Sequence, residues 1–157
     1  MITEAPVIFD QTMSDLISQL EKFTAAEFND IPYTGSWTAG QVADHLYKSY
    51  GVVRTLEGNV IPATRPVDEK IAGIKELFLN FDIKISSPEA ILPSTLPVEK
   101  DDLMMGLINR ISQFKDLIAR EDLSLIVPIM QSLSMVHLHV WNGCTLQYIT
   151  RGGMCIS

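Results

Sequence analysis

The sequence has few of the features that identify disulfide-stapled, secreted or membrane-spanning proteins. Among 157 residues there are only two cysteines, Cys144 and Cys155, too few for the disulfide framework of a small secreted domain. No apolar run reaches the roughly 20 residues that a membrane-spanning helix needs. Residues 1–20 also lack the basic start of a secretory signal. We therefore expect a cytoplasmic protein with reduced thiols and no membrane contact.

Basic residues are also scarce. Lys and Arg number 12 against 19 Asp and Glu, which gives a formal net charge of -7. Such a surface cannot neutralise a phosphate backbone, so we expect no nucleic-acid partner. Hydrophobic residues are abundant at 46%, and a chain of this length can bury about 70% of its unfolded surface. With no repeat and no linker, the sequence predicts a single domain over residues 1–157.

Apolar residues recur at helical spacing in three stretches. The spacing predicts helices over residues 10–23, 38–56 and 99–118, and Asp10 is the expected N-cap of the first. Acidic residues at 99, 101 and 102 suit the positive end of the third helix. These amphipathic stretches indicate a helical bundle.

The region between the second and third helices is less regular. Residues 68–81 form a short amphipathic stretch that we expect to be a crossover helix. Residues 81–98 contain too many prolines and serines for a regular element but enough Ile and Leu to lie against a core. We expect a long ordered connection there.

The sharpest local signal marks the start of the second helix. Thr38 and Gln41 have the spacing of a capping box, and Trp37 and Val42 occupy the two positions of a hydrophobic staple. This helix places His45 on its apolar face and therefore toward the core. The face comprises Val42, His45, Leu46, Ser49, Val53 and Leu56. Neighbouring helical residues do not face each other, so we expect Asp44 to be a solvated surface acid rather than the partner of His45.

Residues 133–151 fit two descriptions. Residues 136–140 alternate in polarity and Asn142-Gly143 is a strong signal for a two-residue hairpin turn. However, an isolated hairpin is marginally stable, and three amphipathic helices need a further apolar surface. From the residues alone, a hairpin and a helix both remain open.

The run from Trp37 to Leu46, with its aromatic residue, capped helix start and His-Leu pair, resembles the second-helix signature of the DinB superfamily of metal-binding four-helix bundles. Residues 65–89 are similar to the crossover of a branch common in Bacteroidetes, and residues 100–117 to its third helix. The resemblance implies an all-α, DinB-like four-helix bundle running up-down-down-up, with a long crossover connection between helices two and three. It also implies that residues 133–151 are the fourth helix.

The family typically binds a divalent metal through one His of helix two and two His spaced i, i+4 on helix four. The resemblance places His45 at the first position and Cys144 and Tyr148 at the other two, which are therefore not histidines. On a helix, His137 shares a face with Cys144, whereas His139 points elsewhere. His45, His137 and Cys144 are then the alternative ligand set for a divalent metal such as Zn²⁺ or Ni²⁺.

Two functions follow from this site. In the first, the metal site is degenerate, no metal or other cofactor is bound, and the protein is non-catalytic, with a small-molecule pocket lined by Trp37, Trp141 and Tyr148 and a homodimer as its candidate assembly. In the second, the rearranged His/Cys site holds a metal, and the protein is an enzyme similar to the DinB-type thiol transferases, in which the metal lowers the pKa of a substrate thiol.

Overall fold

The computed structural model describes residues 5–53, 61–62, 76, 80, 87–120 and 125–126, and these are mainly helical. The elements, in chain order, are α1 (Ala5–Glu21), η2 (Glu27–Asn29), α2 (Ala39–Ser49), η3 (Tyr50–Val52), β1 (Ile61–Pro62), η4 (Glu89–Ile91), α5 (Lys100–Arg120) and β2 (Leu125–Ile126). The two short strands pair antiparallel, with Ile61 opposite Ile126 and Pro62 opposite Leu125. The described part is therefore all-α apart from this two-residue ladder, as the sequence predicts.

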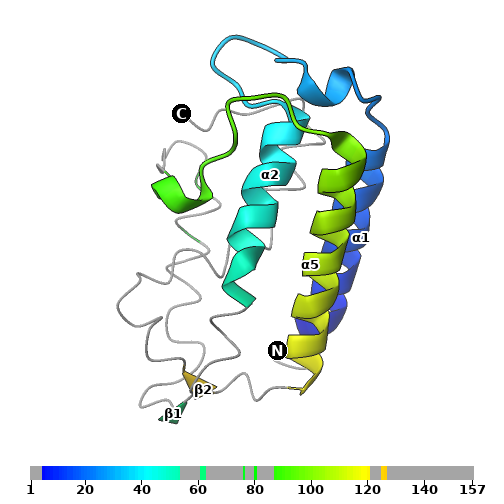
Figure 1. Cartoon of the computed structure of the whole chain (residues 1–157). Helices are drawn as coiled ribbons and strands as arrows, with labels where there is room; N and C mark the ends of the chain where they lie inside the picture. The colour runs from blue at the N-terminus through cyan, green and yellow to red at the C-terminus, as the bar shows by residue number, and fades with distance from the viewer. Residues whose placement is uncertain are drawn as a thin grey trace.

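Helix α1 runs in the opposite direction to α2 and α5 (Figure 1). Residues 22–38 connect the end of α1 to the start of α2, and the chain reaches the start of α5 at the same end of the molecule. Helices α2 and α5 are therefore parallel to each other. Residues 87–99 run alongside α2 to the start of α5 (Figure 1).

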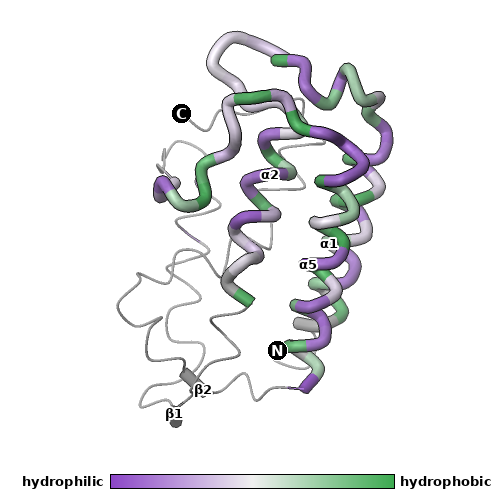
Figure 2. The backbone as a smooth tube through the Cα atoms, viewed as in Figure 1, coloured by the Kyte–Doolittle hydropathy of each residue, from purple (hydrophilic) through white to green (hydrophobic). Residues whose placement is uncertain are grey.

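The core lies where the apolar rows of the three helices meet, and polar and apolar residues are interspersed along each helix (Figure 2). Phe9 of α1 stacks on Phe114 of α5, with 5.6 Å between the ring centroids. Tyr50, which directly follows α2, also contacts Phe114, with 6.4 Å between the ring centroids. The buried apolar residues of the helices and turns are Phe9, Met13, Leu16, Leu20, Phe28, Val42, Ala43, Leu46, Tyr50, Val53, Met104, Leu107, Ile111, Phe114 and Leu117.

Helix α1 does not begin at Asp10, so the N-cap predicted there is wrong. Asp10 lies in the second turn of α1, where its carboxylate pairs with Lys115 of α5 at 2.7 Å. The helix extends upstream because Phe9 continues its apolar row by one turn and packs in the core. At the other end, Lys100 donates to the carbonyls of Glu21, at 3.1 Å, and Phe23, so a cation stabilises the carbonyl end of α1.

The predicted start of the second helix is confirmed at α2. The Thr38 hydroxyl accepts from the backbone N–H of Gln41 at 3.0 Å, and the Gln41 side chain accepts from the backbone N–H of Thr38 at 3.1 Å. The predicted buried face is confirmed from Val42 to Val53, although α2 ends at Ser49 and a 3-10 turn follows. Leu56 lies outside the described residues.

The third predicted helix is α5, and its apolar row is buried at residues 107, 111 and 114. The ordered connection is confirmed only for residues 87–98. The predicted crossover helix over 68–81 and the alternatives for residues 133–151 fall outside the described residues. Within the described part, no helix combines the length and apolarity that crossing a membrane requires.

Candidate functional site

His45 is the one sequence-predicted ligand that the structure describes, and it is buried in the middle of α2. The residue is 8% exposed. Its ring lies against the indole of Trp37, with 5.1 Å between centroids and an interplanar angle of 52°. The structure therefore brings together two of the residues that the sequence assigns to the site, because Trp37 immediately precedes the capping residue of α2.

The imidazole of His45 is also hydrogen-bonded to the backbone. Nδ1 lies 2.8 Å from the carbonyl oxygen of Ile91, which belongs to η4. Because a carbonyl oxygen can only accept, Nδ1 is the donor. In the neutral ring the proton is thus on Nδ1, and Nε2 is the nitrogen with the lone pair. This hydrogen bond fixes both the orientation and the tautomer of the ring.

Asp44 is not the solvated surface acid that the sequence indicates, since it is only 7% exposed. Its Oδ2 accepts two hydrogen bonds, from the backbone N–H of Ser94 at 2.7 Å and from Nζ of Lys48 at 2.9 Å. Lys48 also donates to the carbonyl of Leu92 at 2.8 Å. The buried carboxylate is therefore compensated by one cation and one backbone amide, as a buried charge requires.

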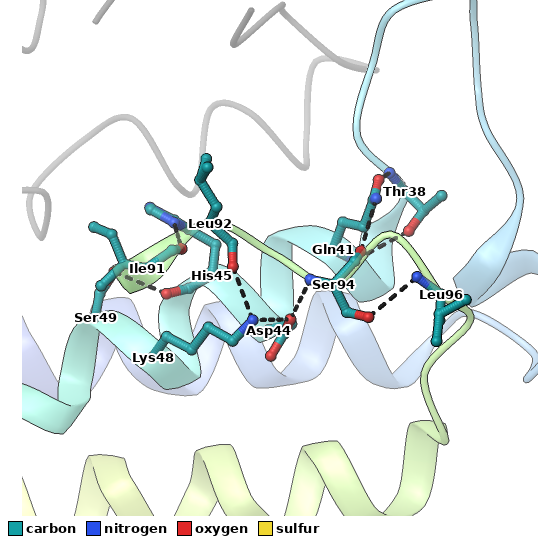
Figure 3. A network of polar contacts seen from close by, with 10 residues as sticks. All are labelled: Thr38, Gln41, Asp44, His45, Lys48, Ser49, Ile91, Leu92, Ser94 and Leu96. Carbon is teal, nitrogen blue, oxygen red and sulfur yellow. Dashed lines mark hydrogen bonds and ion pairs between the residues drawn. The ribbon is translucent and has the colours of Figure 1, made fainter. Parts of the chain in front are cut away.

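Residues 91–98 are termed here the 91–98 segment. The side chains that hold its first part, residues 91–94, come from one stripe of α2 (Figure 3). Residues 41, 44, 45 and 48 follow the i, i+3, i+4, i+7 spacing that places them on one helix face. Besides the contacts of His45, Asp44 and Lys48, Gln41 donates to the carbonyl of Ser94 at 3.0 Å. The backbone polar groups of an extended segment are thereby satisfied by helix side chains.

The far end of the 91–98 segment is held by η2. The side chain of Asn29 donates to the carbonyl of Val98 at 3.0 Å and accepts from its backbone N–H at 2.9 Å. Both polar groups of Val98 are thus paired with one amide side chain. The 91–98 segment is anchored at both ends before the chain enters α5.

The sequence did not identify Asp44, Lys48 or Asn29 as structural anchors. The i, i+4 spacing of Asp44 and Lys48 is visible in the sequence, but the same spacing is typical of solvated ion pairs on helix surfaces. The burial of Asp44 depends on a segment about fifty residues further along the chain. The only available signal was the run of breakers between Pro88 and Pro97, which predicts an extended segment but not the surface it covers.

The other predicted site residues, His137, Trp141, Cys144 and Tyr148, lie outside the described residues. Among the residues that the structure describes, no three His, Cys, Asp or Glu side chains are arranged to hold a metal ion. His45 is therefore the sole predicted ligand whose surroundings are known, and its ring is positioned by a carbonyl and an indole.

Comparison of the chain with protein-family models, curated proteins and solved structures finds no match in any of the three.

Proposed function

We propose that the protein is a non-catalytic, DinB-like four-helix bundle with residues 133–151 as its fourth helix, a degenerate metal site and a retained pocket for a small molecule. The observation that carries the proposal is the hydrogen bond between Nδ1 of His45 and the carbonyl of Ile91. It gives the buried imidazole a role in holding the 91–98 segment, and that role needs no metal. The two remaining ligand positions implied by the resemblance hold Cys144 and Tyr148.

The packing around His45 supports the same reading. The ring lies against Trp37 and is buried, so it also acts as core filling. Tyr148 is a poor ligand for Zn²⁺, because tyrosine must lose its phenol proton to bind a metal and an ordinary phenol does so only near pH 10. In this proposal Trp37, Trp141 and Tyr148 line the pocket, and the protein works in the cytoplasm as a ligand-binding module, with a homodimer as its candidate assembly.

The second candidate function is a metal-dependent enzyme of the thiol-transferase kind. The observation that favours it is the same hydrogen bond, because a carbonyl partner at Nδ1 orients many metal-binding histidines and leaves Nε2 to face the ion. His45, His137 and Cys144 would then hold Zn²⁺ or Ni²⁺. Such an ion would lower the pKa of a substrate thiol. The role of the described residues would be to hold the His45 ring in its ligating tautomer.

Elemental analysis distinguishes the two functions. The untagged protein is purified without chelator, analysed for Zn and Ni, and analysed again after soaking in Zn²⁺ and desalting. His45→Ala is the test variant, and His139→Ala is its matched control because the sequence places His139 off the predicted ligand row. No bound metal before or after soaking supports the non-catalytic proposal. Near-stoichiometric metal that is lost in His45→Ala and kept in His139→Ala overturns it and supports the enzyme.

The pocket is tested separately with the same three proteins. Thermal unfolding is followed in the presence of a library of small apolar and amphipathic compounds, because a ligand that binds only the folded state raises the midpoint. A compound that stabilises the wild type and changes the fluorescence of its two tryptophans supports the pocket. Failure of every compound to shift the midpoint counts against the ligand-binding part of the proposal.

A further inference from the structure

The carbonyl that fixes the tautomer of His45 belongs to a short, stiff piece of chain. Ile91 ends η4, whose last turn is closed by hydrogen bonds from Ile91 N–H to the Pro88 carbonyl and from Leu92 N–H to the Glu89 carbonyl. Leu92 has φ -61° and ψ 138°, the extended conformation favoured before a proline, and Pro93 follows. Proline also fixes its own φ. The Ile91 carbonyl is therefore closely tied to the groups on either side of Pro93.

Those two groups are held by Asp44. On one side of Pro93, the Leu92 carbonyl accepts from Lys48, whose ammonium is itself paired with Asp44 Oδ2. On the other side, the Ser94 N–H donates directly to the same oxygen. One carboxylate oxygen thus fixes the chain before and after the proline. Asp44 and His45 are adjacent on α2, and both of their side chains are hydrogen-bonded to the backbone of the 91–98 segment (Figure 3).

We propose that Asp44 is a positioning residue that sets the tautomer of His45 by holding the 91–98 segment so that the Ile91 carbonyl accepts from Nδ1. When the segment is released, the ring loses the acceptor that keeps the proton on Nδ1, and the proton can move to Nε2. The inference goes beyond the proposed function, because it concerns the protein before any ligand binds and holds whether the site binds a small molecule or a metal.

The tautomer is read directly by long-range ¹⁵N–¹H correlation spectra of protein labelled at histidine ring nitrogens. Spectra are recorded at about pH 8, above the usual titration range of histidine, and the His45 signals are assigned as those missing in His45→Ala. In the wild type we expect a protonated Nδ1 and an unprotonated Nε2. In Asp44→Ala we expect the two ¹⁵N shifts to move toward each other as the second tautomer becomes populated.

Asp44→Asn is the conservative variant. Its side-chain oxygen can still accept from Ser94 N–H, but its amide no longer attracts Lys48, so we expect tautomer shifts between those of the wild type and Asp44→Ala. Asp10→Ala is the matched control, because it removes a carboxylate that also pairs with a lysine, at 2.7 Å, but on the α1–α5 surface. We expect it to leave the His45 shifts unchanged.

Lys48→Met provides a second test that keeps the Asp44 carboxylate and its hydrogen bond from the Ser94 N–H but removes the cation and the donor to the Leu92 carbonyl. It decides the outcome if Asp44→Ala does not fold. Lys100→Met is its control, since Lys100 likewise donates to backbone carbonyls, those of Glu21 and Phe23, but to none in the 91–98 segment. The proposal predicts altered His45 shifts in Lys48→Met and unaltered shifts in Lys100→Met. A wild-type ring protonated on Nε2 overturns it. Unchanged His45 ¹⁵N shifts in folded Asp44→Ala and Lys48→Met also overturn it. So do changes of the same size in the controls Asp10→Ala and Lys100→Met.

Discussion

The carboxylate of Asp44 accepts a 2.7 Å hydrogen bond from the backbone N–H of Ser94, fifty residues further along the chain. Helix α2 and an irregular connection are thereby joined by a buried charge. Because the same oxygen also pairs with Lys48, the contact combines a charge-assisted hydrogen bond with an ion pair. This arrangement fixes the 91–98 segment to α2, although Leu92 and Leu96 remain exposed.

The first prediction concerns the stability that this contact provides. Asp44→Ala leaves the partly buried N–H of Ser94 without its charged acceptor, so we expect the free energy of unfolding to fall by about 1.5–3 kcal/mol. Urea unfolding followed by circular dichroism measures the change. Asp10→Ala breaks a pair whose side chains are 52% and 47% exposed, and we expect about 0–1 kcal/mol there. Equal losses in the two variants would contradict the prediction.

The second prediction concerns Gly40 in the first turn of α2. A Cβ atom at this position would lie 2.6 Å from Val98 Cγ2 and 3.0 Å from the carbonyl oxygen of Phe28. Alanine favours helix over glycine by about 1 kcal/mol, but the overlap with stiff neighbours costs about 1–3 kcal/mol. We therefore expect Gly40→Ala to unfold at lower urea concentration than the wild type.

Gly51→Ala is the matched control for Gly40. A Cβ atom there meets only the guanidinium end of Arg110, at 3.0 Å, and that flexible side chain can move. We expect no loss of stability in Gly51→Ala. A Gly40→Ala protein that is as stable as the wild type would show that η2 and the 91–98 segment can move away from α2.

How much was predictable depends on whether the determining contacts are local. The capping box of Thr38 and Gln41 lies within four residues, so the start of α2 could be located from the sequence. The predicted burial of His45 followed from the apolar spacing of one helix. The start of α1 was missed because Asp10 is a good N-cap residue, whereas the upstream turn is stabilised by the packing of Phe9 on Phe114 of another helix.

The partners of the site residues were not predictable for the same reason. The carbonyl that meets His45 comes from Ile91, 46 residues later, and nothing in the sequence around Ile91 specifies which helix face it covers. The burial of Asp44 likewise requires the folded position of Ser94. Hydrophobic periodicity predicts which face of a helix is buried but not which backbone groups of an irregular segment will be bound by its polar side chains.

A third prediction concerns acid. The Glu27 carboxylate accepts from the backbone N–H and the hydroxyl of Thr24, each at 2.8 Å, and these hydrogen bonds hold the pKa of Glu27 below its ordinary value of 4.5. A carboxylate whose pKa is lower in the folded chain than in the unfolded chain adds to the free energy of unfolding at a pH above its unfolded pKa. This contribution is lost as the pH falls through the folded-state pKa. In Thr24→Ala the hydroxyl is gone but the N–H remains, so we expect the pKa of Glu27 to rise part of the way. Carboxyl ¹³C shifts measured against pH report it.

Thr24→Ser is the control for that experiment, because it keeps the hydroxyl. We expect the pKa of Glu27 in Thr24→Ser to match that of the wild type. If Thr24→Ala also leaves it unchanged, the hydroxyl has no part in stabilising the carboxylate in solution.

The fourth prediction concerns alkali. Tyr50 is 2% exposed, and its hydroxyl donates to Met13 Sδ at 3.6 Å. Burial raises the pKa of Tyr50 well above its ordinary value. Because the folded-state pKa is raised, the unfolded chain loses the tyrosine proton first as the pH rises. The free energy of unfolding is therefore unaffected by this ionisation below the unfolded pKa of about 10, and it falls as the pH rises past that value.

Tyr50→Phe removes this ionisation while keeping the ring that packs on Phe114. At neutral pH we expect the loss of the hydrogen bond to lower the free energy of unfolding by about 0.5–1.5 kcal/mol. Above about pH 10 we expect the free energy of unfolding to fall less steeply with pH in the variant than in the wild type. Urea unfolding at a series of alkaline pH values measures both slopes. Tyr33→Phe, in the connection before α2, accounts for the effect of removing any tyrosine hydroxyl. Parallel pH profiles for the wild type and Tyr50→Phe would mean that the hydroxyl becomes accessible to solvent before the chain unfolds.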